Sequence, residues 1–114
     1  AWQIAHGQTP DRVANHPLLQ DINLPRTGQN ASVGTLVTRT LLIAGEAEMT
    51  RDGEGNLRAQ LRAYDKATGA DVGAVSLPAP QSGSPMTYML KDEQYIVIAV
   101  SGGGMTGELV AFKL

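Results

Sequence analysis

The two histidines are the first candidates for metal binding or proton transfer in this chain. His6 and His16 are its two histidines, and a neutral imidazole both binds metals and titrates near neutrality. A proton relay or a metal pair at these residues is therefore one hypothesis. The sequence favours two unrelated histidines, because neither has a cysteine or an acidic residue at ligand spacing.

Two loops resemble ligand sites only in part. Asp52, Glu54 and Asn56 alternate oxygen ligands as in a Ca²⁺ loop, but Leu57 stands where an EF-hand requires glycine. A solvated hairpin is the favoured interpretation there. Residues 102–104 are three glycines that no Lys-Ser or Lys-Thr pair follows, so they indicate a flexible connection rather than a phosphate loop.

Arg26 is the one candidate for substrate binding outside these segments. It precedes Thr27 and Gly28 in a polar loop, where a guanidinium group could clamp a substrate oxygen. The alternative is an exposed loop arginine without a functional role.

Composition is that of a folded protein, and it excludes several classes of partner. The 114 residues fit one domain spanning residues 1–114, with 42% hydrophobic and 18% charged residues. The net charge is −2 and the basic residues are scattered, so we expect no nucleic-acid partner. Without cysteine there is no disulfide and no thiolate site. No apolar stretch approaches the ~20 residues of a membrane helix, so we expect no membrane span, and any export signal would lie upstream.

Short apolar runs separated by turn residues predict an all-β protein. The expected strands cover residues 2–5, 34–37, 40–44, 57–64, 72–77, 86–90, 94–100 and 108–113. Residues 11–19 allow one or two helical turns, which Pro17 limits in length. The segment 78–85 carries three prolines and cannot be a central strand, so it is expected to connect two sheets.

The two halves of the chain repeat one pattern of strands. Residues 41–45 followed by 61–64 correspond to residues 95–99 followed by 109–112, a period of roughly fifty residues, as in β-propeller blades. Hairpin turns at 52–56 and 91–93 separate strands in each half. The pattern predicts one full four-stranded blade, a second that lacks its outer strand, and one outer strand at residues 2–5.

Residues 61–69 resemble the blade motif of quinoprotein dehydrogenases. Asp65 can accept backbone N–H bonds across a tight turn, and Gly69 can take the positive φ that ends it. The family usually has a tryptophan four residues later, where this chain has Gly73.

Further segments, in order and spacing, resemble the last blades of membrane-associated glucose dehydrogenases and related enzymes that depend on pyrroloquinoline quinone (PQQ). They are residues 2–7, 24–28, 34–38, 83–88, 94–97, 102–104 and 107–112. The resemblance implies about two blades of a usually eight-bladed propeller, with PQQ over its axis and a Ca²⁺ ion nearby. It also implies a periplasmic oxidoreductase that removes hydride from a sugar or alcohol, with an aspartate as base.

The family's catalytic base and metal ligands have no counterpart in this sequence. We therefore expect this chain to form part of the propeller wall, to contribute no catalytic residue and to bind no cofactor by itself. The residues expected near PQQ begin two inner strands, where small residues allow close approach and hydroxyls can bind quinone oxygens. They are Gly34, Thr35, Gly83, Pro85, Met86 and Thr87. The alternative for Met86, as for Trp2 and Tyr88, is packing in the core or between blades.

Two function classes stay open on the sequence alone. The first is the C-terminal segment of a PQQ-dependent dehydrogenase, inactive by itself. The second is a non-catalytic propeller scaffold or partner-binding module, because a propeller fold does not specify activity. In either case open sheet edges and faces predict that the chain binds the remaining blades or associates with itself, for example by adding residues 2–5 to the edge after Phe112.

Overall fold

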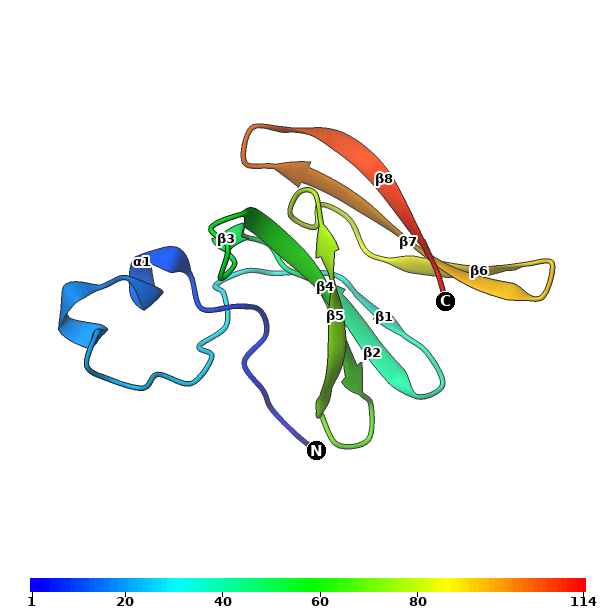
Figure 1. Ribbon diagram of the computed structural model, residues 1–114. Coiled ribbons are helices and arrows are strands. Elements are labelled where there is room, and N and C mark those ends of the chain that lie inside the picture. The colour runs from blue at the N-terminus through cyan, green and yellow to red at the C-terminus, as the bar shows by residue number, and fades with distance from the viewer.

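The chain folds into two stacked antiparallel sheets. The computed structural model describes residues 1–114 and confirms the all-β prediction. Figure 1 shows the second sheet lying across one face of the first, while the N-terminal segment lies on the other side. Neither helical segment has the length and apolar character needed to cross a membrane.

Eight strands and two short helical segments make up the regular structure. The strands are β1 (Thr35–Val37), β2 (Leu41–Gly45), β3 (Thr50–Arg51), β4 (Leu57–Asp65), β5 (Asp71–Leu77), β6 (Met86–Leu90), β7 (Glu93–Gly102) and β8 (Met105–Lys113). The helical segments are α1 (Asp11–Ala14) and a 3₁₀ turn (Pro17–Leu19), within the range predicted for helical turns.

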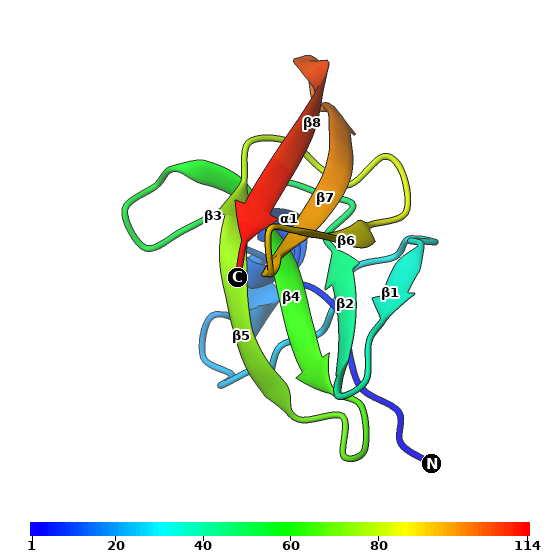
Figure 2. The same cartoon turned by 90° about the vertical axis from the view of Figure 1, so that its right-hand side faces the viewer.

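The topology confirms one complete and one incomplete blade. The first sheet has the order β1-β2-β4-β5, which Figure 2 shows as neighbouring strands, and β3 continues the pairing along the β2 edge of β4. The second sheet has the order β6-β7-β8 and no fourth strand. All strand pairs are antiparallel, as in propeller blades.

The strand predicted at residues 2–5 is wrong. The segment is irregular, and its indole Nε1 at Trp2 donates to the Lys66 carbonyl at 3.0 Å. A Cβ at Gly69 would lie 2.7 Å from the Trp2 ring, so the ring rests directly on the turn between β4 and β5. The segment lies against this turn instead of along a free sheet edge, so it has no ladder to join.

Two tight turns follow the sequence prediction closely. Asp65 Oδ1 accepts from the Ala67 and Thr68 N–H groups at 2.9 Å, and Gly69 has φ +77°. These hydrogen bonds, from Thr68 foremost, lower the pKa of Asp65. Lys91 and Asp92, both with positive φ, form the two-residue connection between β6 and β7.

The core lies between the two sheets. Its buried side chains are Ile43, Ala59, Leu61, Leu77, Ala79, Ile96, Ile98 and Val100. Met86, predicted as a core residue in one interpretation, is 51% exposed instead. It pairs with Val97, and residues directly opposite in a sheet share a face, so Met86 points away from the side that buries Ile96 and Ile98.

We expect Gly69→Ala to lower the free energy of unfolding by about 2–4 kcal/mol. The left-handed backbone accounts for about 1–2 kcal/mol of this loss, and overpacking against Trp2 adds the rest. Gly55→Ala is the matched control, because Gly55 also has positive φ (+82°) but open space around it. Urea unfolding should give a smaller loss for the control, and the two losses should converge in a Trp2→Ala background. If Gly69→Ala and Gly55→Ala lost the same free energy of unfolding while Trp2 was intact, the packing of Trp2 on Gly69 would be contradicted.

Candidate functional site

The starts of β1 and β6 meet at very close range. A Cβ at Gly34 would overlap Ser84 Oγ and would lie 2.8 Å from the Ser84 Cβ and 3.0 Å from its Cα. Only glycine therefore permits this approach of the two chain segments. The contact brings together two of the segments that the sequence predicted to face a cofactor.

Gln81 holds these segments together from the connection between the sheets. Its side-chain Nε2 donates to the Gly34 carbonyl at 2.8 Å, and its Oε1 accepts from the Gly45 N–H. Its own backbone N–H donates to the Glu46 carbonyl at 2.8 Å. One amide side chain thus links the first strand of the first sheet to the connection that leads into β6.

A cleft of about 200 Å³ opens beside this contact, and we call it the rim cleft. It is lined by Ser32, Val33, Gly34, Gln81, Ser82, Gly83 and Ser84. The lining contains three hydroxyl groups and no charged side chain. It can offer hydroxyl and backbone hydrogen bonds to a ligand that approaches closely, but no counter-charge.

The residues predicted to face the cofactor do not all lie together in the structure. Gly34 and Gly83 line the rim cleft, whereas Thr35 lines a different depression on the first sheet. Pro85 is buried directly after the cleft residues. Gly34 and Gly83 thus lie together in one cleft, and their contact with a cofactor stays a prediction.

Thr87 and Met86 do not line the rim cleft. The Thr87 hydroxyl donates to the Tyr95 carbonyl at 2.8 Å and accepts from Gln94 Nε2 at 2.9 Å, so it is engaged within its own sheet. Met86 points to the outer side of that sheet.

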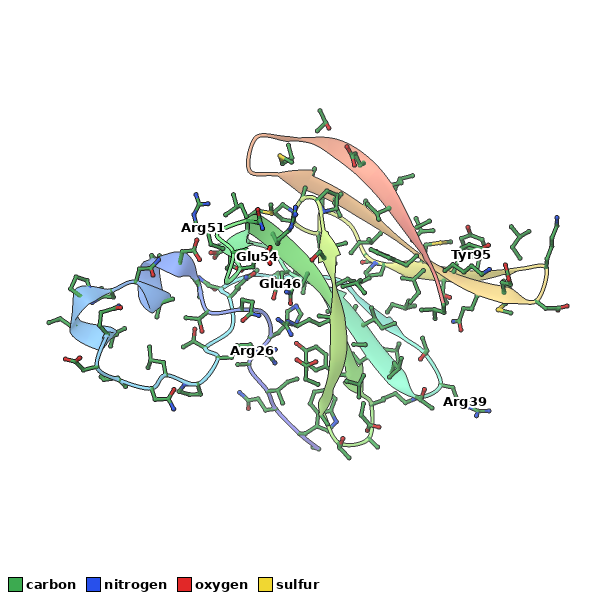
Figure 3. The ribbon with its side chains drawn as sticks, viewed as in Figure 1. Arg26, Arg39, Glu46, Arg51, Glu54 and Tyr95 are labelled. Atoms are coloured by element: carbon green, nitrogen blue, oxygen red, sulfur yellow. The ribbon has the colours of Figure 1, made fainter.

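Arg26 lies apart from the rim cleft. Its Nη1 donates to Asp71 Oδ2 at 2.7 Å at the start of β5, and β5 and β1 are opposite edges of the first sheet. Figure 3 shows Arg26 beside the N-terminal segment. Burial alone would raise the pKa of Asp71, but bonds from Arg26 and the Gly73 N–H, together with the charge of Arg62, outweigh it and lower the pKa.

A buried polar network covers the first sheet on the side away from the second. The Glu46 side chain is fully buried, and its Oε1 accepts from Arg62 Nε at 3.1 Å and from the Gln8 N–H at 2.8 Å. Arg62 also donates to Asp71 Oδ2 at 3.0 Å and to Gln60 Oε1 at 2.6 Å. The network joins the N-terminal segment to β4 and β5.

Sequence analysis did not identify this network, although the sequence carries a signal for it. Glu46 directly follows the apolar run of β2, and Arg62 occupies a central position in β4. Arg62 shares a strand face with Tyr64, which is 1% exposed, because side chains alternate along a strand. A charged residue on the same face as a buried aromatic residue indicates a paired, buried charge.

The two histidines have separate structural partners. His6 Nε2 lies 3.1 Å from the Gly45 carbonyl, which can only accept, so in a neutral imidazole Nε2 donates and Nδ1 accepts from the Tyr64 hydroxyl at 2.8 Å. Burial raises the pKa of Tyr64. His16 Nδ1 accepts from the Leu18 N–H at the start of the 3₁₀ turn. These contacts support the interpretation of two unrelated histidines.

The remaining loop candidates form hairpins. Asp52 Oδ1 accepts from the N–H groups of Glu54 and Asn56 at 2.9 Å. The pKa of Asp52 is lowered, and the hydrogen bond from the Asn56 N–H is the main cause. Gly103 and Gly104 both have positive φ in the turn between β7 and β8. No three histidine, aspartate or glutamate side chains gather where they could hold a metal ion.

We expect Arg62→Met to lower the free energy of unfolding by about 3–5 kcal/mol, because it leaves the Glu46 carboxylate buried without its guanidinium partner. Arg12→Met is the control. Arg12 pairs with Glu48 at 2.9 Å on the surface, where an ion pair contributes about 0–1 kcal/mol. Denaturant unfolding of both variants tests this difference, and a loss below about 1 kcal/mol for Arg62→Met would contradict it.

The contribution of Asp71 to the free energy of unfolding should decrease as the pH falls. Its pKa is lowered in the folded state, so its contribution is present above the unfolded pKa of about 3.9 and is lost as pH falls through the folded pKa. Asp71→Asn should therefore be less stable than the wild type at pH 7, and the gap should narrow on acidification. Thermal unfolding from pH 7 to pH 3 measures the gap. Asp21→Asn, at an exposed position without a side-chain hydrogen bond, is the control for the removal of one surface carboxylate.

Comparison with known proteins identifies the family. Residues 1–96 match the family described as glucose/ethanol/alcohol dehydrogenase, beta-propeller domain (PQQ). A search of curated proteins and a search of solved structures gave no significant match. The matched range includes the complete first sheet, the rim cleft and β6. With its antiparallel blade-like sheets and its match over most of its length, the chain belongs to the PQQ-dependent dehydrogenase β-propeller family.

Proposed function

We propose that this chain forms one sector of the propeller wall in a quinoprotein dehydrogenase that oxidises a sugar or an alcohol. The observation that carries the proposal is the family match over residues 1–96. The meeting of β1 and β6 at the rim cleft supports it, because small residues there allow a bound group to approach the backbone closely.

The rim cleft does not fit PQQ by itself. PQQ is a planar quinone that bears several carboxylates, and such a group requires cationic side chains or many N–H donors. The cleft supplies hydroxyl and backbone groups without a cation. We therefore assign the cofactor's charged partners, a Ca²⁺ ion and the catalytic base to other blades of the parent enzyme.

In that enzyme, this chain positions the two strand starts and encloses one sector of the pocket. Gln81 fixes the spacing of the two strand starts, and the close approach of Gly34 to Ser84 keeps the cleft narrow. The glucose-dehydrogenase-like substrate range and the periplasmic location belong to the proposal. Both rest on the resemblance of the sequence segments to that family.

The isolated chain should not oxidise glucose or ethanol. With PQQ and Ca²⁺ added, we expect no dye reduction above a control without protein, because the chain contributes only one sector of the pocket. In the parent enzyme, Gly34→Val should lower kcat/KM by roughly 10- to 100-fold and reduce retained PQQ, because the added side chain forces β1 and the Ser84 segment apart.

Gly53→Val is the matched control in the parent enzyme. Gly53 lies in the hairpin between β3 and β4 with no atom within contact range of an added Cβ, so PQQ retention and activity should not change. Absorbance of the retained cofactor and steady-state kinetics measure both variants. A non-catalytic scaffold would show no PQQ retention and no dye reduction in the parent protein, and this result would refute the proposed function.

A further inference from the structure

The rim cleft carries three hydroxyl groups that the fold does not use. Ser32, Ser82 and Ser84 are exposed, and none of their side-chain oxygens makes a hydrogen bond within the chain. Thr87, further along the same segment, instead has its hydroxyl engaged both as a donor and as an acceptor. The three free hydroxyls line a cleft of about 200 Å³ and are therefore available to a ligand.

Hydrogen bonds fix the walls of the rim cleft, and this chain provides both walls. The Ser82 N–H donates to the Ala99 carbonyl at 3.0 Å, so β7 holds the segment that carries Ser82 and Ser84. The Gln81 side chain joins the same segment to the Gly34 carbonyl at 2.8 Å. The hydroxyl groups are thus held in place before a ligand binds, which reduces the entropy lost on binding.

The chemistry of the lining favours an uncharged ligand that is rich in hydroxyl groups. A serine hydroxyl both donates and accepts hydrogen bonds, and a hydroxyl of a sugar or polyol does the same, so the two complement each other. The lining has no charged side chain to offset a carboxylate or a phosphate group. Val33 is its one hydrophobic residue, so an alkyl chain would bury little apolar surface there.

The volume of the rim cleft limits the ligand to a small molecule or to one end of a larger one. Pockets that enclose drug-sized ligands have volumes of about 300–1,000 Å³. The rim cleft, at about 200 Å³, is smaller than these. One sugar ring, or a few neighbouring hydroxyl groups of a polyol, matches this size better than a fused planar quinone with its carboxylates.

We propose that the rim cleft binds hydroxyl groups of a neutral sugar or polyol, and that Ser32, Ser82 and Ser84 determine specificity for such a ligand over a simple alcohol. The role of this ligand as a substrate rests on the proposed function. The hydroxyls bound here are those that do not react, since the base and the cofactor are assigned to other blades. Ethanol has only its reacting hydroxyl, and a site that binds further hydroxyls discriminates against a molecule that lacks them.

NMR titration of the full chain with D-glucose tests the binding. Amide signals of residues 32–34 and 81–84 should shift in a saturable way, with a dissociation constant in the millimolar range expected for a few neutral hydrogen bonds. Tetrahydropyranylmethanol, which has the same ring but a single hydroxyl group, should cause no saturable shift of these signals. If glucose caused no saturable shift in the cleft, or if both compounds bound equally, the proposal would be overturned.

Substitution of single serines identifies the groups that bind the sugar. Ser82→Ala and Ser84→Ala each remove one hydroxyl, and each should weaken glucose binding by roughly 3- to 10-fold, the effect of one neutral hydrogen bond. Ser76→Ala is the matched control, because Ser76 is an exposed serine of β5 outside the cleft, so this variant should bind like the wild type. The amide spectra show whether each variant is folded. Equal affinities for folded variants of all three serines would contradict the role of the cleft hydroxyls.

Kinetics of the parent enzyme separate this inference from the proposed function. Ser82→Ala should lower the ratio of kcat/KM for glucose to that for ethanol by roughly 3- to 10-fold, whereas Ser76→Ala should not change it. An unchanged ratio for Ser82→Ala, or oxidation of ethanol alone, in an enzyme that retains PQQ would overturn the inference and leave the proposed function intact. A parent protein that retains no PQQ would refute the proposed function, and the glucose titration of this chain would still decide whether the rim cleft binds sugars.

Discussion

The apolar contact between the two sheets is the interaction on which the rest of the structure depends. A single blade cannot bury its apolar face alone, so β6-β7-β8 depends on the first sheet to cover that face. Ile96 and Ile98 bury that face against Ile43 and Leu61 of the first sheet. The same contact brings the starts of β1 and β6 together, so the rim cleft is a consequence of core packing. Gly34 is required there because the sheets come so close.

On the opposite side of the first sheet, a buried ion pair and its hydrogen bonds hold the N-terminal segment in place. Glu46 is fully buried, and its Oε2 has no hydrogen-bond partner, so its charge depends on Arg62 and on the Gln8 N–H. Such a pair gains little over apolar packing but is costly to break. It therefore fixes where the N-terminal segment lies rather than adding much net stability. Placement of that segment in turn forms one wall of a groove beside Tyr64.

Local sequence signals predicted seven of the eight strands, all but β3, because those signals act over a few residues. The Asp65 turn and the two-residue Lys91-Asp92 connection each contain the chemistry that their backbone requires. Residues 2–5 were predicted wrongly as a strand, since an apolar run says nothing about whether a partner edge is available. The pairing of Arg26 with Asp71 brings together residues far apart in the sequence, and only the tertiary fold sets it.

The apolar runs indicate whether one face or both faces of a strand are covered. A strand with one covered face shows alternating apolar and polar residues, whereas a strand covered on both faces shows a continuous apolar run. β2 has such a run and lies between the second sheet on one side and the N-terminal segment on the other. The run in β7 from Tyr95 to Val100 is equally continuous, yet only its Ile96 face is covered within the chain. The composition of β7 is therefore that of a strand inside a stack of sheets, and its second face fits another protein surface better than water.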